Sequence, residues 1–296
     1  MNRRIARTLA VLALPPALLL SAATASAATG PAAAQPKKDP SAGKAKLDLS
    51  AGKARHTVAA WYVDQSTGTV VVEATDVDDA RSFVRASGAG ADPVRIVKVD
   101  ELPRPFYDVR GGDAFYIGSP RCSVGFSVRR GTSPGFVTAG HCGRRGAATA
   151  GYNRVTQGTF AGSSFPGNDH AWVQTNSSWQ PTPRVNRYNG AYVTVTGSTP
   201  APIGAAVCRS GSTTGWRCGT VQAVNATVNY PQGTVSGLTR TNACAEPGDS
   251  GGSFLSGSQA QGVVSGGSGN CSSGGTTYFQ PLGEILSTYG LTLVVG

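Results

Sequence analysis

A serine stands between an aspartate and two glycines in the stretch NACAEPGDSGGSF, residues 242–254. Gly, Asp and Ser all favour tight turns, so the G-D-S-G motif alone is consistent with a simple turn. The alternative is that Ser250 is a nucleophile. A serine hydroxyl becomes nucleophilic when a neighbouring base accepts its proton, and histidine is the usual base. This hypothesis requires a histidine, and a group that orients it, elsewhere in the chain.

Two histidines follow residue 107, and they differ in their surroundings. His141 ends the apolar segment GFVTAGHCG beside Cys142, where a disulfide would hold the backbone that aims the imidazole. His170, in FPGNDHAWV, is interpreted as a structural histidine. We therefore predict that His141 is the base.

The orienting group should be a carboxylate, because a carboxylate holds the imidazole in the correct tautomer. The aspartates after residue 107 are Asp108, Asp113, Asp169 and Asp249. The first two lie at the start of this region, and Asp249 is too close to Ser250 along the chain to orient a distant imidazole. Asp169 remains. The order of these residues along the chain, His141, Asp169, Ser250, is one of those known for a catalytic triad of serine, histidine and aspartate.

Short strands are the elements that must position these residues. After Val109 the chain is rich in Gly, Ser and Thr, and alternating runs such as SVGFSV, HAWVQT and QGVVSG are separated by turn signals. This pattern predicts an all-β domain over residues 107–296, with helical periodicity only in the last fifteen residues. Residues 56–106 contain a hairpin, a short helix and a strand, which predicts a small α+β unit. The Ala/Pro/Gly/Lys-rich residues 28–55 are predicted to be disordered.

The N-terminus has the pattern of a secretory signal peptide over residues 1–27. A basic start is followed by an apolar run and by a small-residue A-S-A site that ends near Ala27. An N-terminal membrane anchor is the alternative, but the apolar run is too short and wrongly flanked for a membrane span. No later stretch is apolar over a length that could cross a bilayer. We expect a secreted, extracellular protein with no membrane partner.

Six cysteines fit an extracellular location, where disulfides persist. Fifteen pairings are possible in principle, and the spacing suggests three local ones: Cys122–Cys142, Cys208–Cys218 and Cys244–Cys271. A metal site is the alternative; the chain has no C-x-x-C pair and too few histidines for one, so we expect no metal.

The formal charge of +10 raises the question of a nucleic-acid partner. All lysines lie within the first hundred residues, and the twelve arginines and six acids after residue 107 are scattered singly or in pairs. No basic helix or basic–aromatic strip is present, which indicates a solvated basic surface and no nucleic-acid partner.

Four segments together carry a family resemblance: FVTAGHC, FPGNDHAWV, VCRSGSTTGWRCGT and ACAEPGDSGGS…GVVSGGSGNC. They resemble the bacterial chymotrypsin-like serine proteases, namely α-lytic protease and, more closely, the streptogrisins. The resemblance runs from about Val109 to Gly296 and implies a trypsin-like fold of two six-stranded antiparallel β-barrels, with the active site between them. It implies a monomeric endopeptidase that needs no cofactor. The alternative is a secreted β-barrel binding module that does no chemistry.

The resemblance also implies roles around Ser250. Gly248 permits a sharp turn, so that the amides of Gly248 and Ser250 form an oxyanion hole. Gly251 and Gly252 allow the substrate and a neighbouring strand to approach closely. Asp249 is implied to pair with the buried guanidinium of Arg209.

The family pattern implies how substrate is bound. Ser265 matches the serine that hydrogen-bonds the triad aspartate, and the backbone of Ser265, Gly266 and Gly267 should bind substrate as an added β-strand. Ala245 and Val264 should line the specificity pocket. α-Lytic protease has methionines at both positions, and glutamate-specific relatives have a histidine at the latter. These small apolar residues therefore predict cleavage after Phe, Tyr, Leu or Met, with Glu246 at the rim as a solvated acid or a selectivity element.

The upstream unit, over residues 56–101, resembles a shortened pro-region of the same family. Mature relatives begin a few residues before the Gly-Gly-Asp that matches residues 111–113, which predicts self-cleavage after Phe106 or Tyr107. The pro-unit is then a partner that assists folding of the barrels; a mere spacer is the alternative.

Overall fold

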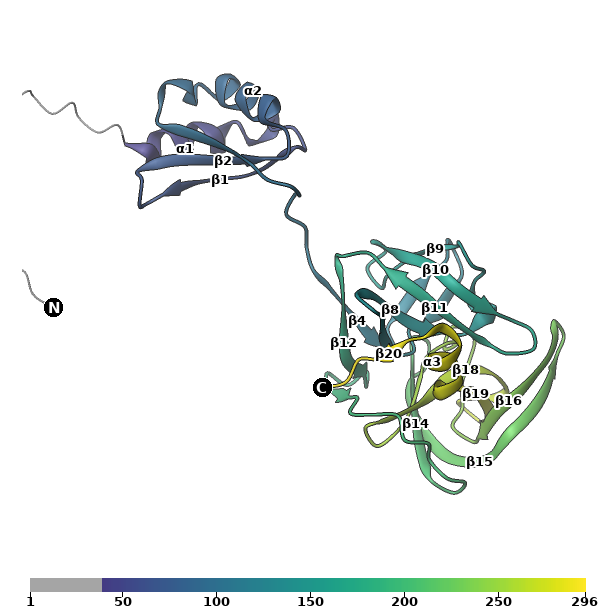
Figure 1. The fold of residues 1–296 in the computed structure, drawn as a ribbon. Helices are drawn as coiled ribbons and strands as arrows, with labels where there is room; N and C mark the ends of the chain where they lie inside the picture. The colour runs from purple at the N-terminus through teal and green to yellow at the C-terminus, as the bar shows by residue number, and fades with distance from the viewer. Residues whose placement is uncertain (1–38) are drawn as a thin grey trace, which may run out of the picture. The chain divides into compact units, whose positions relative to one another are not determined.

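The computed structural model describes residues 39–296, and the predicted signal peptide lies outside the described residues. The described chain forms two compact units, one ending at Pro103 and one beginning at Arg104 (Figure 1). Among these residues, no helix has both the length and the apolar character needed to span a membrane.

The first unit is a three-stranded sheet covered by helices. Its elements are α1 (Pro40–Leu49), a 3₁₀ turn (Ala51–Lys53), β1 (Val58–Asp64), β2 (Thr69–Ala74), α2 (Val77–Ser87), a second 3₁₀ turn (Ala89–Ala91) and β3 (Val94–Lys98). The strands lie in the order β1-β2-β3; β1 and β2 form the predicted hairpin, and β3 pairs with β2 in parallel after the crossover through α2. Asp76 caps α2 by accepting the amides of Asp78 and Asp79, and Gly88 ends the helix in the left-handed conformation.

The predicted disorder of residues 28–55 is wrong for residues 40–53, which form α1 and a 3₁₀ turn. Asp39 caps α1 by accepting the amide of Ser41, and Pro40 occupies its first turn. Leu47 is fully buried in the core of the unit, and Lys46 Nζ lies 2.9 Å from Asp92 Oδ2. The helix depends on these tertiary contacts, because its own amphipathic pattern is weak.

The second unit is almost entirely β. Its first half holds β4 (Tyr107–Gly111), β5 (Ala114–Tyr116), β6 (Arg121–Ser123), β7 (Ser127–Arg130), β8 (Ser133–Thr138), β9 (Ala148–Ala150), β10 (Thr156–Ser164), β11 (His170–Thr175), β12 (Trp179–Asn186) and β13 (Tyr192–Thr194). Its second half holds β14 (Ala206–Gly211), β15 (Gly215–Tyr230), β16 (Gly233–Thr241), β17 (Ser253–Ser256), β18 (Gln259–Asn270), β19 (Gly274–Pro281), α3 (Leu282–Tyr289) and β20 (Thr292–Leu293).

The strands of the two halves form separate sheets, except that β20 of the second half pairs with β7 of the first. In the second half, six strands close into a barrel in the order β14-β15-β16-β19-β18-β17. In the first half, an eight-stranded sheet has the order β20-β7-β8-β11-β10-β9-β5-β6, and β13-β12-β4 form a smaller sheet in which β12 and β4 run in parallel. The predicted fold class is confirmed: an all-β unit with a short C-terminal helix, preceded by a small α+β unit.

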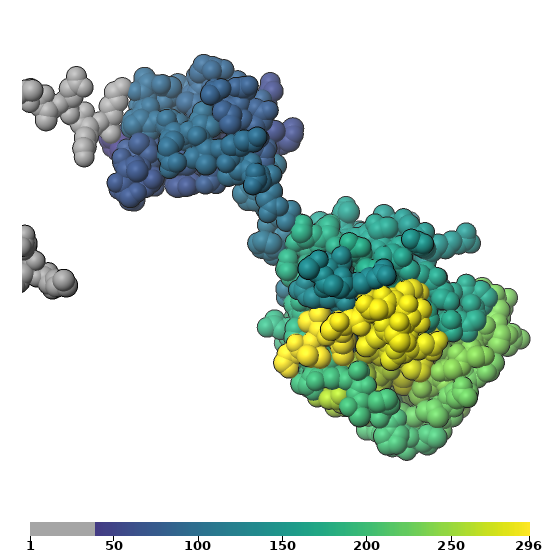
Figure 2. All heavy atoms as spheres, viewed as in Figure 1, coloured from purple at the N-terminus to yellow at the C-terminus, as the bar shows by residue number. Residues whose placement is uncertain are grey.

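The C-terminal helix joins the two halves. Leu282 and Ile285 of α3 are buried in one apolar cluster with Val128 and Trp172 of the first half and Leu255 of the second. In the space-filling view the C-terminal segment lies across the surface between the teal first half and the green second half (Figure 2). This shared core holds the two halves in one arrangement.

Candidate active site

His141 and Asp169 are brought together by the pairing of two buried strands. β8 and β11 are antiparallel neighbours, with Thr138 opposite Ala171. His141 follows the end of β8, in the 3₁₀ turn Gly140–Cys142, and Asp169 directly precedes β11. Since the end of one antiparallel strand lies beside the start of the next, the two side chains meet at the same edge of the sheet.

The geometry of this pair is that of an oriented imidazole. His141 Nδ1 lies 2.8 Å from Asp169 Oδ2 and 3.1 Å from Oδ1, and the amide of His141 donates to Oδ1 at 3.0 Å. Asp169 is fully buried. Its Oδ2 also accepts the hydroxyl of Ser265 at 2.6 Å, and its amide donates to Gln280 Oε1 at 2.8 Å. These bonds favour a proton on Nδ1, so that Nε2 is the basic nitrogen.

Ser250 lies on a loop anchored beside the His141 segment. Its carbonyl accepts the amide of Ser123 at 2.8 Å and lies 3.9 Å from the sulfur of Cys142. Within residues 39–296 its hydroxyl makes no hydrogen bond, so the structure does not join it directly to His141.

The amides around Ser250 fall into two groups. Those of Asp249, Gly251 and Gly252 donate to the carbonyls of Glu246, Val264 and Asp249, respectively. In the part of the chain that the structure describes, the amides of Gly248 and Ser250 have no acceptor. Gly248 has φ +96°, and a Cβ there would lie 2.4 Å from Thr213 Oγ1. Only glycine therefore fits this turn. The two amides of Gly248 and Ser250 are donors available to a ligand.

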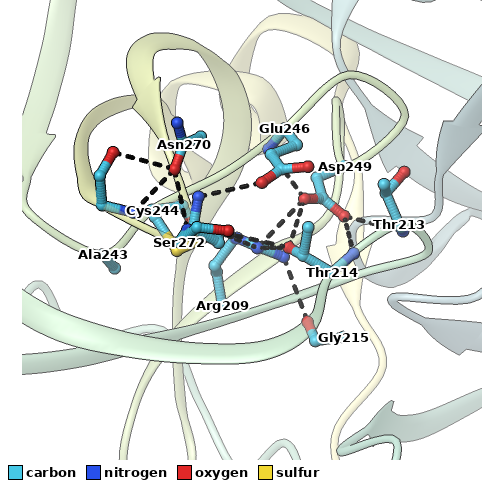
Figure 3. Close-up of a disulfide and its surroundings, with 12 residues drawn as sticks. Arg209, Thr213, Thr214, Gly215, Ala243, Cys244, Glu246, Asp249, Asn270 and Ser272 are labelled. Carbon is cyan, nitrogen blue, oxygen red and sulfur yellow. Dashed lines mark hydrogen bonds and ion pairs between the residues drawn. A yellow bond between two sulfur atoms is a disulfide. The ribbon is translucent and has the colours of Figure 1, made fainter.

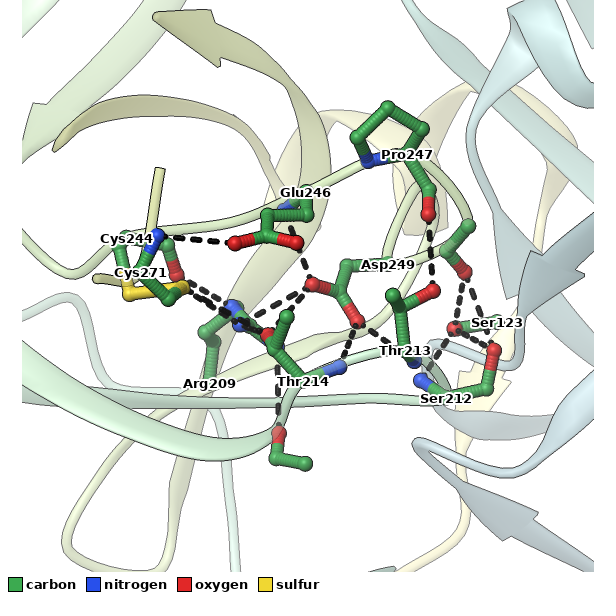
Figure 4. Close-up of polar contacts among 12 residues, drawn as sticks. Ser123, Arg209, Ser212, Thr213, Thr214, Cys244, Glu246, Pro247, Asp249 and Cys271 are labelled. Carbon is green, nitrogen blue, oxygen red and sulfur yellow. Dashed lines mark hydrogen bonds and ion pairs between the residues drawn. A yellow bond between two sulfur atoms is a disulfide. The ribbon is translucent and has the colours of Figure 1, made fainter. Parts of the chain in front are cut away.

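Asp249 and Arg209 form a fully buried ion pair (Figure 4). Arg209 Nη2 lies 3.1 Å from Asp249 Oδ2. The guanidinium also donates to the carbonyls of Cys244 and Gly215, and it contacts the hydroxyl of Thr214. Burial lowers the pKa of Arg209, and the charge of Asp249 opposes that shift.

The carboxylate of Asp249 has further donors on both oxygens. Oδ1 accepts the amides of Thr213 and Thr214, and Oδ2 accepts the amide of Glu246 and the hydroxyl of Thr214 (Figures 3 and 4). Both carboxylate oxygens of Asp249 accept hydrogen bonds and its charge is paired with Arg209. The loop from residue 246 to residue 252 is therefore anchored at Asp249.

The described residues form three disulfides, with the pairs Cys122–Cys142, Cys208–Cys218 and Cys244–Cys271; the second bridges the neighbouring strands β14 and β15. The first joins β6 to the turn that carries His141. The third joins the loop of Ser250 to the residue after β18, and Figure 3 shows it next to the buried ion pair.

A hollow of about 340 Å³ lies beside the His141–Asp169 pair. Ser265, Gly266 and Gly267 line one side of it, and Tyr230 and Phe165 line another. The Tyr230 hydroxyl lies 3.1 Å from Ser265 Oγ, and burial raises the pKa of Tyr230.

Val264 and Ala245 both belong to the core of the second barrel. Val264 is buried in an apolar cluster against which Ala245 packs. The backbone of Val264 is bonded to the Ser250 loop, because its amide donates to Gly252 and its carbonyl accepts from Gly251.

Two other side chains, those of His170 and Glu246, make hydrogen bonds that support the fold. His170 is buried, its Nδ1 lies 3.1 Å from the hydroxyl of Tyr289, and burial lowers its pKa. Glu246 is half-buried and accepts the amide of Cys271 at 2.9 Å, so it is not the freely solvated acid that was one expectation.

Sequence reasoning missed three residues of the site: Gln280, Tyr230 and Phe165. Gln280 is fully buried and binds the amide of Asp169 from β19, more than a hundred residues away along the chain. Phe165 lies edge-on to the ring of His141, with centroids 5.7 Å apart. No motif distinguished these residues, because their roles arise from long-range packing.

The two residues at the predicted processing junction differ. Phe106 is 72% exposed. Tyr107 begins β4, where its amide donates to Ser178 and its ring lies 5.0 Å from that of Trp179.

The geometry agrees with comparisons to known proteins. Residues 109–287 match the Trypsin family, and residues 41–91 match the alpha-lytic protease prodomain. The chain is 60% identical over 238 residues to Streptogrisin-C of Streptomyces griseus, which covers 80% of this chain but 52% of that protein. The chain thus spans about half the length of that relative.

Two further matches cover their counterparts more fully. Streptogrisin-A of Streptomyces griseus is 43% identical over 237 residues, or 79% of this chain and 78% of that protein. Protease A of Thermobifida fusca superposes with a TM-score of 0.62 at 59% identity, covering 64% of this chain and all of that structure. The chain therefore belongs to the trypsin family of serine proteases, in a group with the streptogrisins, and carries a prodomain of the alpha-lytic protease type.

Proposed function

We propose that this chain is a secreted serine endopeptidase, made as a pro-enzyme, that cleaves peptide bonds through an acyl-enzyme. One observation carries the proposal: a histidine held by a buried aspartate lies beside a serine loop in which two amides have no acceptor among residues 39–296. His141, Asp169 and Ser250 are the proposed catalytic residues, and the amides of Gly248 and Ser250 are the proposed oxyanion hole. Membership of a protease family supports the same assignment.

Each proposed residue has one task in the reaction. The oxygen of Ser250 attacks the carbonyl carbon of the scissile bond, and Nε2 of His141 takes the hydroxyl proton. The buried carboxylate of Asp169 stabilises the imidazolium that forms. The carbonyl oxygen becomes an oxyanion bound by the two amides, and each such donor typically stabilises it by about 3–4 kcal/mol.

The second half of the cycle reverses the proton transfer. The oxyanion collapses, the carbon–nitrogen bond breaks, and His141 gives its proton to the leaving amine. A water molecule then attacks the acyl group with His141 as base, and the carboxylic acid is released with Ser250 restored. No step needs a cofactor.

We propose that large apolar or aromatic side chains, those of Phe, Tyr, Leu and Met, are preferred at the cleaved bond. Val264 and Ala245 are small and apolar, Ala245 packs against the apolar cluster that contains Val264, and the backbone of Val264 is bonded directly to the Ser250 loop. Substrate would add as a β-strand along Ser265 to Gly267, which line the hollow beside His141.

Cleavage of the pro-unit is proposed to unblock the site rather than to build it. Asp249 already has a buried cation in Arg209, so no new N-terminus is needed to satisfy its charge. We propose that the enzyme cuts its own chain after Phe106 or Tyr107. The exposure of Phe106 favours the first bond, since Tyr107 is already paired in β4. Barrels with many long-range pairings fold slowly, and the pro-unit is proposed to assist their folding.

The role of the buried carboxylate is tested by Asp169→Asn. The amide favours the wrong imidazole tautomer, so we expect kcat to fall about 10⁴-fold while the fold is retained. Steady-state kinetics on a peptide substrate, with circular dichroism as the check on folding, measures this. Asp113→Asn is the matched control, because Asp113 is a buried aspartate bound to Arg110 and Asn186 away from His141. Near-full activity of Asp169→Asn would mean that another carboxylate orients the base.

The pocket assignment is tested by Val264→Met. The longer side chain should fill the pocket and shift preference from Phe toward Ala by about 10- to 200-fold in the ratio of kcat/KM values. The ratio is insensitive to partial loss of folded protein. Val264→Ala, which cannot fill the pocket, should retain the preference for Phe. An unchanged Phe/Ala ratio in Val264→Met would show that this residue does not line the pocket.

Self-processing is tested by expressing Ser250→Ala in a host without other secreted proteases. Without the nucleophile the chain should accumulate uncut, as pro-unit plus protease unit, in intact-mass measurements. The control Ser272→Ala changes an exposed serine and should be cut like the wild type. Normal cutting of Ser250→Ala would assign maturation to another protease.

A further inference from the structure

A second hollow, of about 630 Å³, shares His141, Phe165 and Gln232 with the first hollow and is otherwise lined by other residues, on the segment 140–145 among others. Its lining includes His141, Arg144, Arg145, Phe165 and Gln232, and among the described residues no Asp or Glu lines it. The carboxylate of Asp169, which belongs to the same site, is fully buried against the imidazole of His141. The hollow is therefore a cationic surface in direct contact with the proposed base.

Both arginines of this hollow are available to a ligand. Arg144 and Arg145 are exposed, and within residues 39–296 neither guanidinium has an ion-pair or hydrogen-bond partner. Arg110 and Arg209 of the same unit, by contrast, are each paired with an aspartate. Two unpaired guanidiniums on one wall attract a carboxylate by charge and by hydrogen bonding.

The turn that carries the arginines is held in place. The amide of Gly146 donates to Phe160 at 2.8 Å, and the amide of Ala147 donates to the carbonyl of Arg144 at 3.0 Å. Gly143 packs on the ring of Phe160 so closely that a Cβ there would lie 2.6 Å from it. The two guanidiniums therefore extend from an anchored backbone next to the disulfide of Cys142.

The two hollows divide the substrate between them. The residues before the cleaved bond are proposed to lie along Ser265 to Gly267, in the smaller hollow. The arginine-lined hollow lies on the side of Cys142, whose sulfur is 3.9 Å from the carbonyl of Ser250. It is therefore assigned to residues that follow the cleaved bond.

The proposed processing junction of this chain has an acidic residue on the side that would face the arginine-lined hollow. In PRPFYDV, the basic Arg104 precedes the proposed cut and the acidic Asp108 follows it. Asp108 is the first residue after a cut behind Tyr107, and the second after a cut behind Phe106. A cationic hollow on the leaving-group side would attract Asp108.

We propose that Arg144 and Arg145 form a subsite for an acidic side chain one or two residues after the cleaved bond. The proposal rests on the proposed endopeptidase activity. It makes the enzyme select acidic leaving segments, of which its own mature N-terminus is one.

Matched peptides test this subsite. They carry Phe before the cut and either Asp or the uncharged isostere Asn at the first or second position after it. For wild type we expect kcat/KM to favour Asp by about 1.5- to 5-fold at one of these positions, as solvent-exposed ion pairs allow. The preference should fall toward one at about 1 M salt, where the Debye length is about 3 Å.

Variants assign the preference to the two arginines. Arg144→Ala with Arg145→Ala should bring the Asp/Asn ratio close to one, mainly through a lower kcat/KM for the Asp peptide. Arg144→Glu with Arg145→Glu should reverse the charge preference of the subsite, so that a peptide with Lys at this position is preferred over one with Gln. The control is Arg129→Ala with Arg130→Ala, an exposed arginine pair at the end of β7 that lines neither hollow; it should retain the wild-type ratio.

Each failure has a distinct meaning. Cleavage of the Asn peptide with no preference for Asp overturns the subsite but leaves the proposed activity intact. A preference for an acidic residue before the cleaved bond also overturns the subsite. So does a preference for Asp after the bond that persists when both arginines are replaced by alanine. If the wild type cleaves no peptide, the proposed endopeptidase activity fails, and the subsite fails with it.

Discussion

The buried pair of Arg209 and Asp249 is the constraint on which the serine loop depends. Removing either partner would leave an uncompensated buried charge, at a cost of about 3–5 kcal/mol. The hydrogen bonds to both oxygens of Asp249 hold the loop, while the amides of Gly248 and Ser250 have no acceptor in the part of the chain that the structure describes. Because the pair lies entirely within the protease unit, the loop is shaped by the fold itself and not by a chain end released on cleavage.

The rest of the site follows from two sheets that share a core. The first half supplies the histidine and its aspartate through the antiparallel pairing of β8 and β11. The second half supplies Ser250 and, from β18, the Ser265 that bonds the same aspartate. α3 packs against both halves, which explains how groups from two separate sheets can keep hydrogen-bond distances of about 3 Å.

Much of this arrangement could be predicted from the sequence because chemically capable residues are scarce. Two histidines and four aspartates after residue 107 allowed His141 and Asp169 to be chosen by elimination. The helix at residues 40–49 was missed, since burial of Leu47 stabilises it more than its local pattern does. Gln280 was missed for a related reason: a buried amide that bonds a distant backbone group has no local signature.

The central claim is that Ser250 is a nucleophile activated within this constellation, and covalent labelling tests it most directly. The chain is treated with a serine-directed phosphonylating reagent, and intact mass and peptide mapping locate the adduct. The account predicts one adduct per chain, on the peptide that contains Ser250, and none on Ser250→Ala. Absence of any adduct on the wild type, or equal labelling of Ser250→Ala, would contradict it.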